Sequence, residues 1–434
     1  MMNIDIVVYE LKHFLRSPFK IVALMLFSAA AIYGLHNGAR LFTDQRTEIE
    51  KITVRMNEQK EKVISYFEKG EKGPADRPWM DITTPFWAIW NVPAYHFKAP
   101  SPAMVYSIGQ AEQYGYYKMI TVWASPYDAD MAEEIANPER LQTGTLDFAF
   151  VVLFLLPLLM LILVYDIHSA EAEQDFVSLI EVQTTSKTVW VLSRMSFYCG
   201  ILILLLAALM IYGATLTSAA GSTLLDMFVT TVLYVSLWSM LFFIVVRSGK
   251  TIMINSLIMI GMWLCVVFII PGGVHQMVSV SRPMEMMTDL IDAQRDEREK
   301  LFAMPDSVLD ARLIALFPEI KDSPLAHDPA KKSRARNFSA SALANELMKG
   351  AAAPLYQEHE TKNLLIRRMS WFSPYTYFQN RFNSSSGTHF DDYAVYRSEI
   401  QARIDRRIRM MVRDIWNDRR VDKAGYFEYE RLLK

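Results

Sequence analysis

The sequence predicts a mainly α-helical protein that crosses a membrane several times. Five stretches are almost entirely apolar, and a helix of about 20 such residues spans the hydrocarbon core of a bilayer. Hydrophobic residues make up 52% of the 434 residues, yet 21% are charged, so sizeable polar regions must accompany the spans. In those regions apolar residues recur at helical spacing. The predicted fold is a polytopic α-helical membrane protein with five spans and two extracytoplasmic, mostly helical domains.

Residues 1–20 are predicted to form an amphipathic helix that leads into the first span. Apolar residues between Ile4 and Leu15 recur at helical spacing, opposite charged residues. Such a helix lies in the membrane interface, either as a plain anchor or with a further role. The first span is predicted at residues 21–39, after a basic flank.

Residues 40–145 form the first polar region. A helix is predicted from Asp44 to Glu68, and the segment Lys69–Pro78, rich in Gly and Pro, should end it. The segment Trp79–Tyr127 is dense in aromatic residues. These rings could form a platform for an apolar or aromatic ligand. A compact core, or an aromatic belt at the membrane interface, is the favoured interpretation.

The second span, residues 146–165, contains Pro157, whose freed carbonyl partner must be satisfied by a neighbouring helix, a hydroxyl or water. An acidic and then amphipathic turn follows at residues 166–190, before the third span at residues 191–216. A turn of this kind presents a surface to a soluble partner. The candidate residues of this surface are Asp166, Glu171, Glu173, Asp175, Phe176, Leu179, Lys187 and Arg194.

Two further spans are predicted at residues 224–246 and 251–271. In the short connections, basic residues gather at the N-terminus, in the 166–190 turn and between the last two spans. By the positive-inside rule these three segments are cytoplasmic. Residues 40–145 and 272–434 are therefore expected to be extracytoplasmic.

The second polar region, residues 272–434, is predicted to be mostly helical. Helices are expected at Met286–Met304 and Asp306–Leu316. The basic segment 327–341 could touch lipid headgroups, but a solvated loop is the favoured interpretation. A long amphipathic helix should follow Thr388 and Asp391, which have the spacing of a capping box.

No motif for catalysis or for a bound metal or nucleotide is apparent. Gly249-Lys250-Thr251 carries only the last part of a P-loop, and no HExxH occurs. No ionisable residue lies in the middle of a predicted span, which argues against coupling to protons or sodium. The 45 Lys and Arg balance the 47 Asp and Glu, so nucleic acid is not an expected partner.

The central stretch resembles the permease subunits of ABC-2 type ATP-binding-cassette exporters. In that family a membrane helix ends in an aspartate, a glutamate-rich turn follows, and a basic residue leads into the next helix, as from Asp166 to Arg194 here. Ser373-Pro374 and the segment Gly387–Arg397 resemble a bacterial subgroup with long extracytoplasmic loops. Further similarity to that subgroup lies in Asn137-Pro138, Gly144, Leu146-Asp147, Phe150-Val151, Leu156-Pro157-Leu158, Tyr165-Asp166 and Ser169.

The resemblance implies that residues 166–190 are a coupling helix seated in a groove of a separate ATPase, and that residues 1–20 are an elbow helix. It also implies a dimer of ATPase subunits, a second permease chain that is identical or related, and a place in the bacterial inner membrane. ATP and magnesium would bind the partner ATPase, so this chain would hold no cofactor and would not be an enzyme. The subgroup continues into a sixth span, and none follows in the sequence up to Lys434.

A membrane-anchored receptor or scaffold is the alternative. Its extracytoplasmic domains would bind a partner, and its spans would only hold it in place. An enzyme is a third and weaker possibility. The identity of whatever binds the 166–190 turn would separate the first two.

Overall fold

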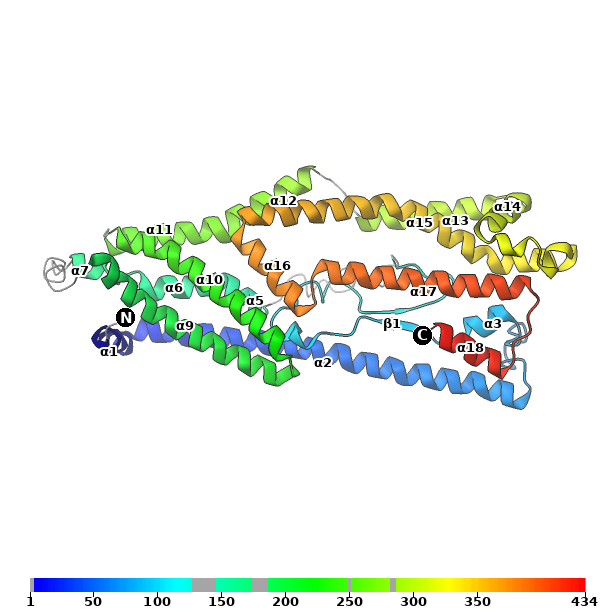
Figure 1. Cartoon of the computed structure of the whole chain (residues 1–434), viewed down its shortest axis with the longest axis horizontal. Helices are drawn as coiled ribbons and strands as arrows, with labels where there is room; N and C mark the ends of the chain where they lie inside the picture. The colour runs from blue at the N-terminus through cyan, green and yellow to red at the C-terminus, as the bar shows by residue number, and fades with distance from the viewer. Residues whose placement is uncertain (1–3, 127–145, 174–185, 249–250, 282–285, 434) are drawn as a thin grey trace.

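The protein is elongated and mainly α-helical, which confirms the coarser part of the predicted fold class (Figure 1). One end carries α1 (Ile4–Leu15) and α7 (Ser169–Glu173), and we call it the near end. The far end carries α14 (Asp306–Leu316) and α18 (Lys423–Leu433). The computed structural model describes residues 4–126, 146–173, 186–248, 251–281 and 286–433.

Among the described residues, four helices are long and apolar enough to cross a membrane. They correspond to the predicted first, third, fourth and fifth spans. The last three lie mainly in the near half of the molecule, whereas the helix that includes the first span continues into the far half (Figure 1). The fifth is one continuous helix that reaches Val278, beyond the predicted boundary at residue 271. The elements are α2 (Pro18–Lys69), α9 (Lys187–Thr217), α10 (Gly221–Arg247), and α11 (Ile252–Leu264) with η5 (Cys265–Ile269) and α12 (Ile270–Ser281).

The predicted second span is a shorter apolar helix with a π-helical turn in it. Pro157 has no N–H, so it leaves a carbonyl of the preceding turn without a helical donor. The hydroxyl of Tyr234 on α10 donates a hydrogen bond to the carbonyl of Leu153, four residues before the proline, at 2.5 Å. A neighbouring helix therefore supplies the donor, as membrane packing requires. The span consists of α5 (Phe148–Phe150), η4 (Val151–Leu155) and α6 (Leu156–Val164).

The predicted first span and the predicted helix Asp44–Glu68 are one uninterrupted helix, α2, of 52 residues. At 1.5 Å per residue it is about 78 Å long. It ends at Gly70, which has a φ of 68°, a left-handed conformation that glycine adopts without strain. The predicted domain boundary at residue 40 is therefore no break in the structure, because a single helix joins the two halves.

The far half has its own apolar core, built mainly on the long helix α17 (Phe390–Trp416). Its side chains Ile400, Ile404 and Ile408 are buried, which confirms the predicted apolar stripe. A short antiparallel sheet of β1 (Tyr95–Phe97) and β2 (Tyr117–Met119), absent from the sequence-based prediction, lies beside it. This half also contains α3 (Pro85–Trp90), α13 (Met286–Ala303) and α15 (Pro329–Met369). Helix α16 (Pro374–Ser386), between α15 and α17 in the sequence, packs against the spans instead.

The prediction of a loop at residues 327–341 is wrong, because most of this segment is the beginning of α15. The side chain of Asp328 accepts hydrogen bonds from the backbone N–H groups of Ala330 and Lys331, and Pro329 occupies the first helical position. Both are helix-start signals that the run of basic residues obscured. Arg336 in this segment is buried and forms an ion pair with Asp306.

The predicted capping box of α17 is wrong by one residue. His389 is the N-cap, and the carboxylate of Asp392 accepts a hydrogen bond from its backbone N–H at 3.0 Å. Thr388 instead donates a hydrogen bond to the carbonyl of Ser107 at 3.1 Å, which ties the start of α17 to the first polar region. The predicted helices at 286–304 and 306–316 are confirmed as α13 and α14.

The aromatic segment Trp79–Tyr127 contributes largely to the interior, as far as the structure describes it. The rings of Phe86 and Phe338 stack with centroids 4.4 Å apart, and Tyr106 is fully buried. Trp79 is an exception, since its side chain is exposed. These contacts favour the compact-core interpretation over a ligand platform.

Candidate functional site

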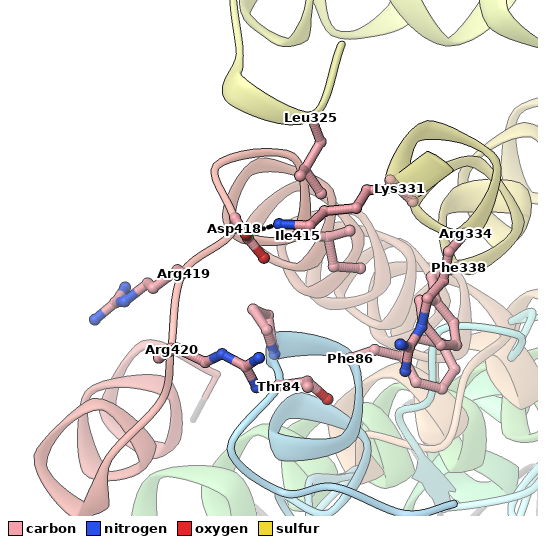
Figure 2. A pocket seen from close by; sticks show the side chains of 12 residues that line it. Thr84, Phe86, Leu325, Lys331, Arg334, Phe338, Ile415, Asp418, Arg419 and Arg420 are labelled. Carbon is pink, nitrogen blue, oxygen red and sulfur yellow. Dashed lines mark hydrogen bonds and ion pairs between the residues drawn. The ribbon is translucent and has the colours of Figure 1, made fainter. Parts of the chain in front are cut away.

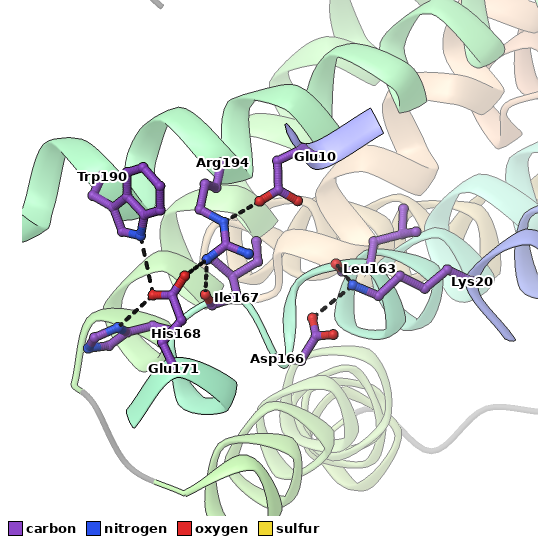
Figure 3. A network of polar contacts seen from close by, with 9 residues as sticks. All are labelled: Glu10, Lys20, Leu163, Asp166, Ile167, His168, Glu171, Trp190 and Arg194. Carbon is purple, nitrogen blue, oxygen red and sulfur yellow. Dashed lines mark hydrogen bonds and ion pairs between the residues drawn. The ribbon is translucent and has the colours of Figure 1, made fainter. Parts of the chain in front are cut away.

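A buried polar network at the near end joins the turn after the second span to its neighbouring helices (Figure 3). At its centre is Arg194 of α9, only 4% exposed. Its guanidinium forms ion pairs with Glu10 of α1 and with Glu171 of α7. It also donates a hydrogen bond to the carbonyl of Ile167. One cation thus holds α1, α9 and the turn together.

Glu171 has further partners on both sides. The indole N–H of Trp190 donates a hydrogen bond to its Oε2 at 3.2 Å, and Nδ1 of His168 lies 3.7 Å from the same atom (Figure 3). Because Trp190 also lies on α9, Glu171 fixes the first turns of that helix to α7. Its carboxylate is largely enclosed, with 14% of the side chain exposed.

A second ion pair fixes the end of α6 to α2. The ammonium of Lys20, buried near the start of α2, lies 2.8 Å from a carboxylate oxygen of Asp166 and donates to the carbonyl of Leu163 at 3.0 Å. It also lies 5.0 Å from the ring centroid of Tyr198 on α9. A buried cation needs such surroundings, since desolvation is costly unless partners compensate it.

The turn also contacts the start of α11. A carboxylate oxygen of Glu173 accepts a hydrogen bond from the backbone N–H of Ile252 at 2.9 Å. The amide of Asn255 donates to the hydroxyl of Ser169 at 2.6 Å. Carboxylates are favoured at helix N-termini, where backbone N–H groups lack partners. The described part of the turn is therefore tied to α1, α2, α9 and α11.

The structure brings together four of the eight candidate surface residues: Asp166, Glu171 and Arg194 in the buried network, and Glu173 beside it on the surface. Lys187 begins α9 and is half-buried. Asp175, Phe176 and Leu179 lie outside the described residues. Asp166, Glu171 and Arg194 form ion pairs within this chain. They therefore position the turn and do not offer free charges to a partner.

Sequence reasoning missed Glu10, Lys20, His168 and Trp190. Glu10 had been placed on the polar face of an interfacial helix, whereas it is fully buried against Arg194. A usable signal existed, because Lys20 and Asp166 stand at the same membrane boundary of two successive predicted spans. Opposite charges at equal depth on adjacent helices are candidates for pairing.

A joint connects the spans to the far half, and its centre is Asp147. This carboxylate caps α5, because it accepts a hydrogen bond from the backbone N–H of Phe150. It also accepts a hydrogen bond from the N–H of Ile108 at 2.9 Å and is buried by protein. The hydroxyl of Tyr106 donates to the carbonyl of Met210 on α9 at 2.6 Å.

Two glycines of α2 allow the backbones to pack closely at this joint. A Cβ on Gly34 would lie 2.7 Å from the backbone of Asp147 and Phe148, and one on Gly38 would lie 2.7 Å from the carbonyl oxygens of Met104 and Val105. Glycines four residues apart let backbones approach closely in membrane helices. The sequence contains this Gly-x-x-x-Gly spacing at Gly34 and Gly38, which is a signal for close packing of a helix in the membrane.

A pocket of about 190 Å³ lies at the far end, between the starts of α3 and α15 and the end of α17 (Figure 2). Phe86 and Phe338 form its apolar wall. Lys331 lies 3.0 Å from Asp418, whereas Arg334 has no carboxylate partner among the described residues. The unbalanced positive charge favours an anionic group over a cationic one. No group of three or more His, Cys, Asp or Glu in the described ranges could hold a metal ion.

The fold thus defines a helical protein with a bundle of apolar helices and a large polar extension. Residues 290–431, most of that extension, match the family model described as "Domain of unknown function (DUF3526)". The match covers less than half of the chain and includes none of the near-end network. No curated protein and no solved structure matches the chain.

Proposed function

We propose that this chain is the transmembrane permease subunit of an ABC-2 type exporter complex. It would couple ATP hydrolysis by a separate ATPase to export, or to mechanical work on an extracytoplasmic partner. One observation carries the proposal: the turn after the second span is fastened by buried ion pairs and hydrogen bonds to four helices at once. A turn fastened in this way can transmit a displacement to several helices at once, which a coupling function needs.

In this proposal the near end is cytoplasmic, and the chain lies in the inner membrane of a bacterium. Displacement of the turn would move α9 through Arg194 and α2 through Lys20. Because α2 is continuous from Pro18 to Lys69, its motion would reach the far half directly. The joint at Asp147 would carry the motion of α6 and α9 to the same region.

The direct contacts to the ATPase would come from the candidate residues that the buried network does not account for; of these, the structure describes Glu173, which is exposed, and Lys187, which is half-buried. We assign them to Glu173, Asp175, Phe176, Leu179 and Lys187. The partners would be an ATPase dimer, which binds ATP and magnesium, and a second permease chain. Nucleic acid has no part in this function, and the chain itself would perform no catalysis.

Co-purification tests this function. The tagged chain, solubilised with detergent from its native membrane, should retain a nucleotide-binding subunit with ATPase activity. Glu173→Lys should release most of it, because the substitution reverses an exposed charge at the proposed contact. The matched control is Glu360→Lys, also exposed but on α15. A chain that retains no nucleotide-binding subunit, or retains it equally in both variants, would contradict the proposal and favour the receptor or scaffold alternative.

A further inference from the structure

Exposed aromatic side chains cluster at the turn between α15 and α16. Trp371 and Phe372, in the short 3-10 helix η8 (Ser370–Phe372), are 78% and 76% exposed, and Tyr377 in the first turn of α16 is also exposed. Single exposed apolar side chains are ordinary on a surface that faces water, but a group of exposed rings marks an interaction site. Here the rings of Trp371 and Tyr377 contact each other, with centroids 5.7 Å apart. We call Ser370–Tyr377 the aromatic tip.

Helix α16 lies against the spans, not against the core of the far half. Its Phe378 contacts Tyr234 of α10 with ring centroids 5.0 Å apart, and Phe378 and Phe382 belong to the apolar core of the bundle. At its other end, Arg381 and Ser385 contact the carboxylate of Asp226 near the start of α10. α16 therefore runs beside α10 from Asp226 toward the middle of the span.

The depth of the tip follows from these contacts. The apolar run of α10 begins directly after Asp226, and Tyr234 lies eight residues further, about 12 Å along the helix. Along α16, Pro374 lies about 17 Å from Ser385 in the same direction. Because α16 is inclined to the long axis of the molecule (Figure 1), its extent along the membrane normal is less than this length. Each leaflet contributes about 15 Å to a hydrocarbon core of about 30 Å, so the aromatic tip lies within the far leaflet.

We infer that the aromatic tip inserts into the bilayer from the far side and contacts lipid. Trp and Tyr are the residues that favour the membrane interface, and Phe suits the hydrocarbon below it. Arg367, one turn before the tip, has its guanidinium 3.9 Å from the carboxylate of Asp391 at the start of α17. A long basic side chain that reaches back toward the polar boundary is the arrangement called snorkelling.

The tip gives the far half a further attachment to the membrane, besides α2 and α12. Helix α16 passes through Gly387 and Thr388 into α17, the central helix of the far half. A change in the spacing of the spans would therefore shift α17 through the tip as well as through α2. This inference depends on the membrane location in the proposed function and not on an ATPase.

Spin-label accessibility tests the inference with the full-length chain alone in phosphatidylcholine vesicles. Cys199 and Cys265 are replaced by serine, and a nitroxide is attached after Phe372→Cys or, separately, Tyr377→Cys. Accessibility to oxygen, which concentrates in lipid, is compared with accessibility to a water-soluble nickel chelate. Leu204→Cys provides the lipid-facing control, since Leu204 is 72% exposed within α9. Phe302→Cys provides the water-facing control, since Phe302 is 76% exposed near the end of α13.

We expect the labels at 372 and 377 to be more accessible to oxygen than to the nickel chelate, as at 204. The label at 302 should be more accessible to the nickel chelate. A label at 372 that contacts nickel as freely as the one at 302 would overturn the inference. So would oxygen preference at 204 but at neither tip position. No ATPase is present in this experiment, so its failure would leave the coupling proposal to its own test.

Discussion

One arginine in each half of the molecule is almost fully buried, Arg194 at the near end and Arg407 in the far half, and the two are stabilised in opposite ways. At the near end, Arg194 is surrounded by two carboxylates, and removal of the arginine would leave both of them without their cation. In the far half, Arg407 of α17 is 1% exposed, and its Nη2 donates to the backbone carbonyls of Ile89 and Val92. It has no carboxylate partner among the described residues, and burial lowers its pKa to about 10.

This difference shows which interactions stabilise the packing around each arginine. The near end depends on mutual compensation of charges, which fixes the relative positions of several helices at one point. Around Arg407, the far half depends on an apolar core and on hydrogen bonds to backbone carbonyls, which fix residues 89–92 to α17. A site that transmits force needs the first kind of connection, because it joins separate elements directly.

The largest difference between the two halves is expected when each of these arginines is replaced by methionine and the loss of unfolding free energy is compared. Arg194→Met leaves Glu10 and Glu171 buried and unpaired, which costs about 3 to 5 kcal/mol of unfolding free energy. Arg407→Met removes a buried charge and takes one donor from each of the carbonyls of Ile89 and Val92, of which the first still accepts from the N–H of Val92. A loss of about 1 to 2 kcal/mol is therefore expected. Thermal unfolding of the two variants in the same detergent measures the difference.

The control for Arg194→Met adds Glu10→Gln and Glu171→Gln to the same chain. With no buried charge left unpaired, the triple variant should regain more than half of the lost stability. Equal destabilisation by Arg194→Met and Arg407→Met, or no recovery in the triple variant, would contradict the distinction between the two halves.

Gly34→Ala tests the joint that connects them. The added Cβ would lie 2.7 Å from backbone atoms of Asp147 and Phe148, so helix α2 must shift away from the joint. A loss of about 1 to 3 kcal/mol is expected, as for other overpacked sites. Gly200→Ala on α9 is the control, because a Cβ there meets nothing within 4 Å. If thermal unfolding shows no greater loss at Gly34 than at Gly200, the close approach is not important for stability.

Tyr234→Phe sharpens the comparison within the near half, where it removes a neutral hydrogen bond instead of a charge. The carbonyl of Leu153 would lose its donor, with an expected cost of about 1 kcal/mol. Tyr33→Phe, at an exposed residue of α2, should leave the unfolding temperature unchanged. A loss as large as that of Arg194→Met would mean that charge compensation is not what distinguishes the near end.

The smallest effect is expected from pH in the far half. Burial would raise the pKa of Asp414, but hydrogen bonds from Arg413 and Tyr429 outweigh it and the net pKa is lowered. A carboxylate with a lowered folded-state pKa stabilises the fold above its unfolded value, about 3.9, and this contribution is lost as pH falls below it. Asp414→Asn should therefore flatten the decline in stability between about pH 4 and pH 2. An unchanged pH profile would exclude this contribution.

Periodicity was enough to predict the elements with one clear face. The stripe on α17 and the four long apolar helices repeat one pattern over many residues, and the structure has them where the sequence indicates. The start of α15 was misread because four basic residues in a short segment resemble a solvated loop, although Asp328 and Pro329 form a helix start. The continuity of α2 was not predicted. The sequence shows no local difference between a span that ends at the membrane boundary and a helix that continues past it.

The site was harder to predict because its contacts connect residues that are distant in sequence. Lys20 and Asp166 are 146 residues apart, and Glu10 and Arg194 are 184 apart. Residue types alone suggested that the charges of the turn face a partner. Only the packing of α1 against α9 shows that Glu171 and Arg194 are occupied inside the chain.

Photo-crosslinking at the turn tests the central proposal most directly. A photoreactive amino acid at Glu173, which is exposed beside the buried network, is activated in native membranes, and the crosslinked proteins are identified by mass spectrometry. The same probe at Val395, exposed on α17, is the control. We expect an ATP-hydrolysing subunit to be crosslinked from 173 and not from 395. Crosslinks from 173 to this chain or to lipid alone would contradict the proposed coupling function.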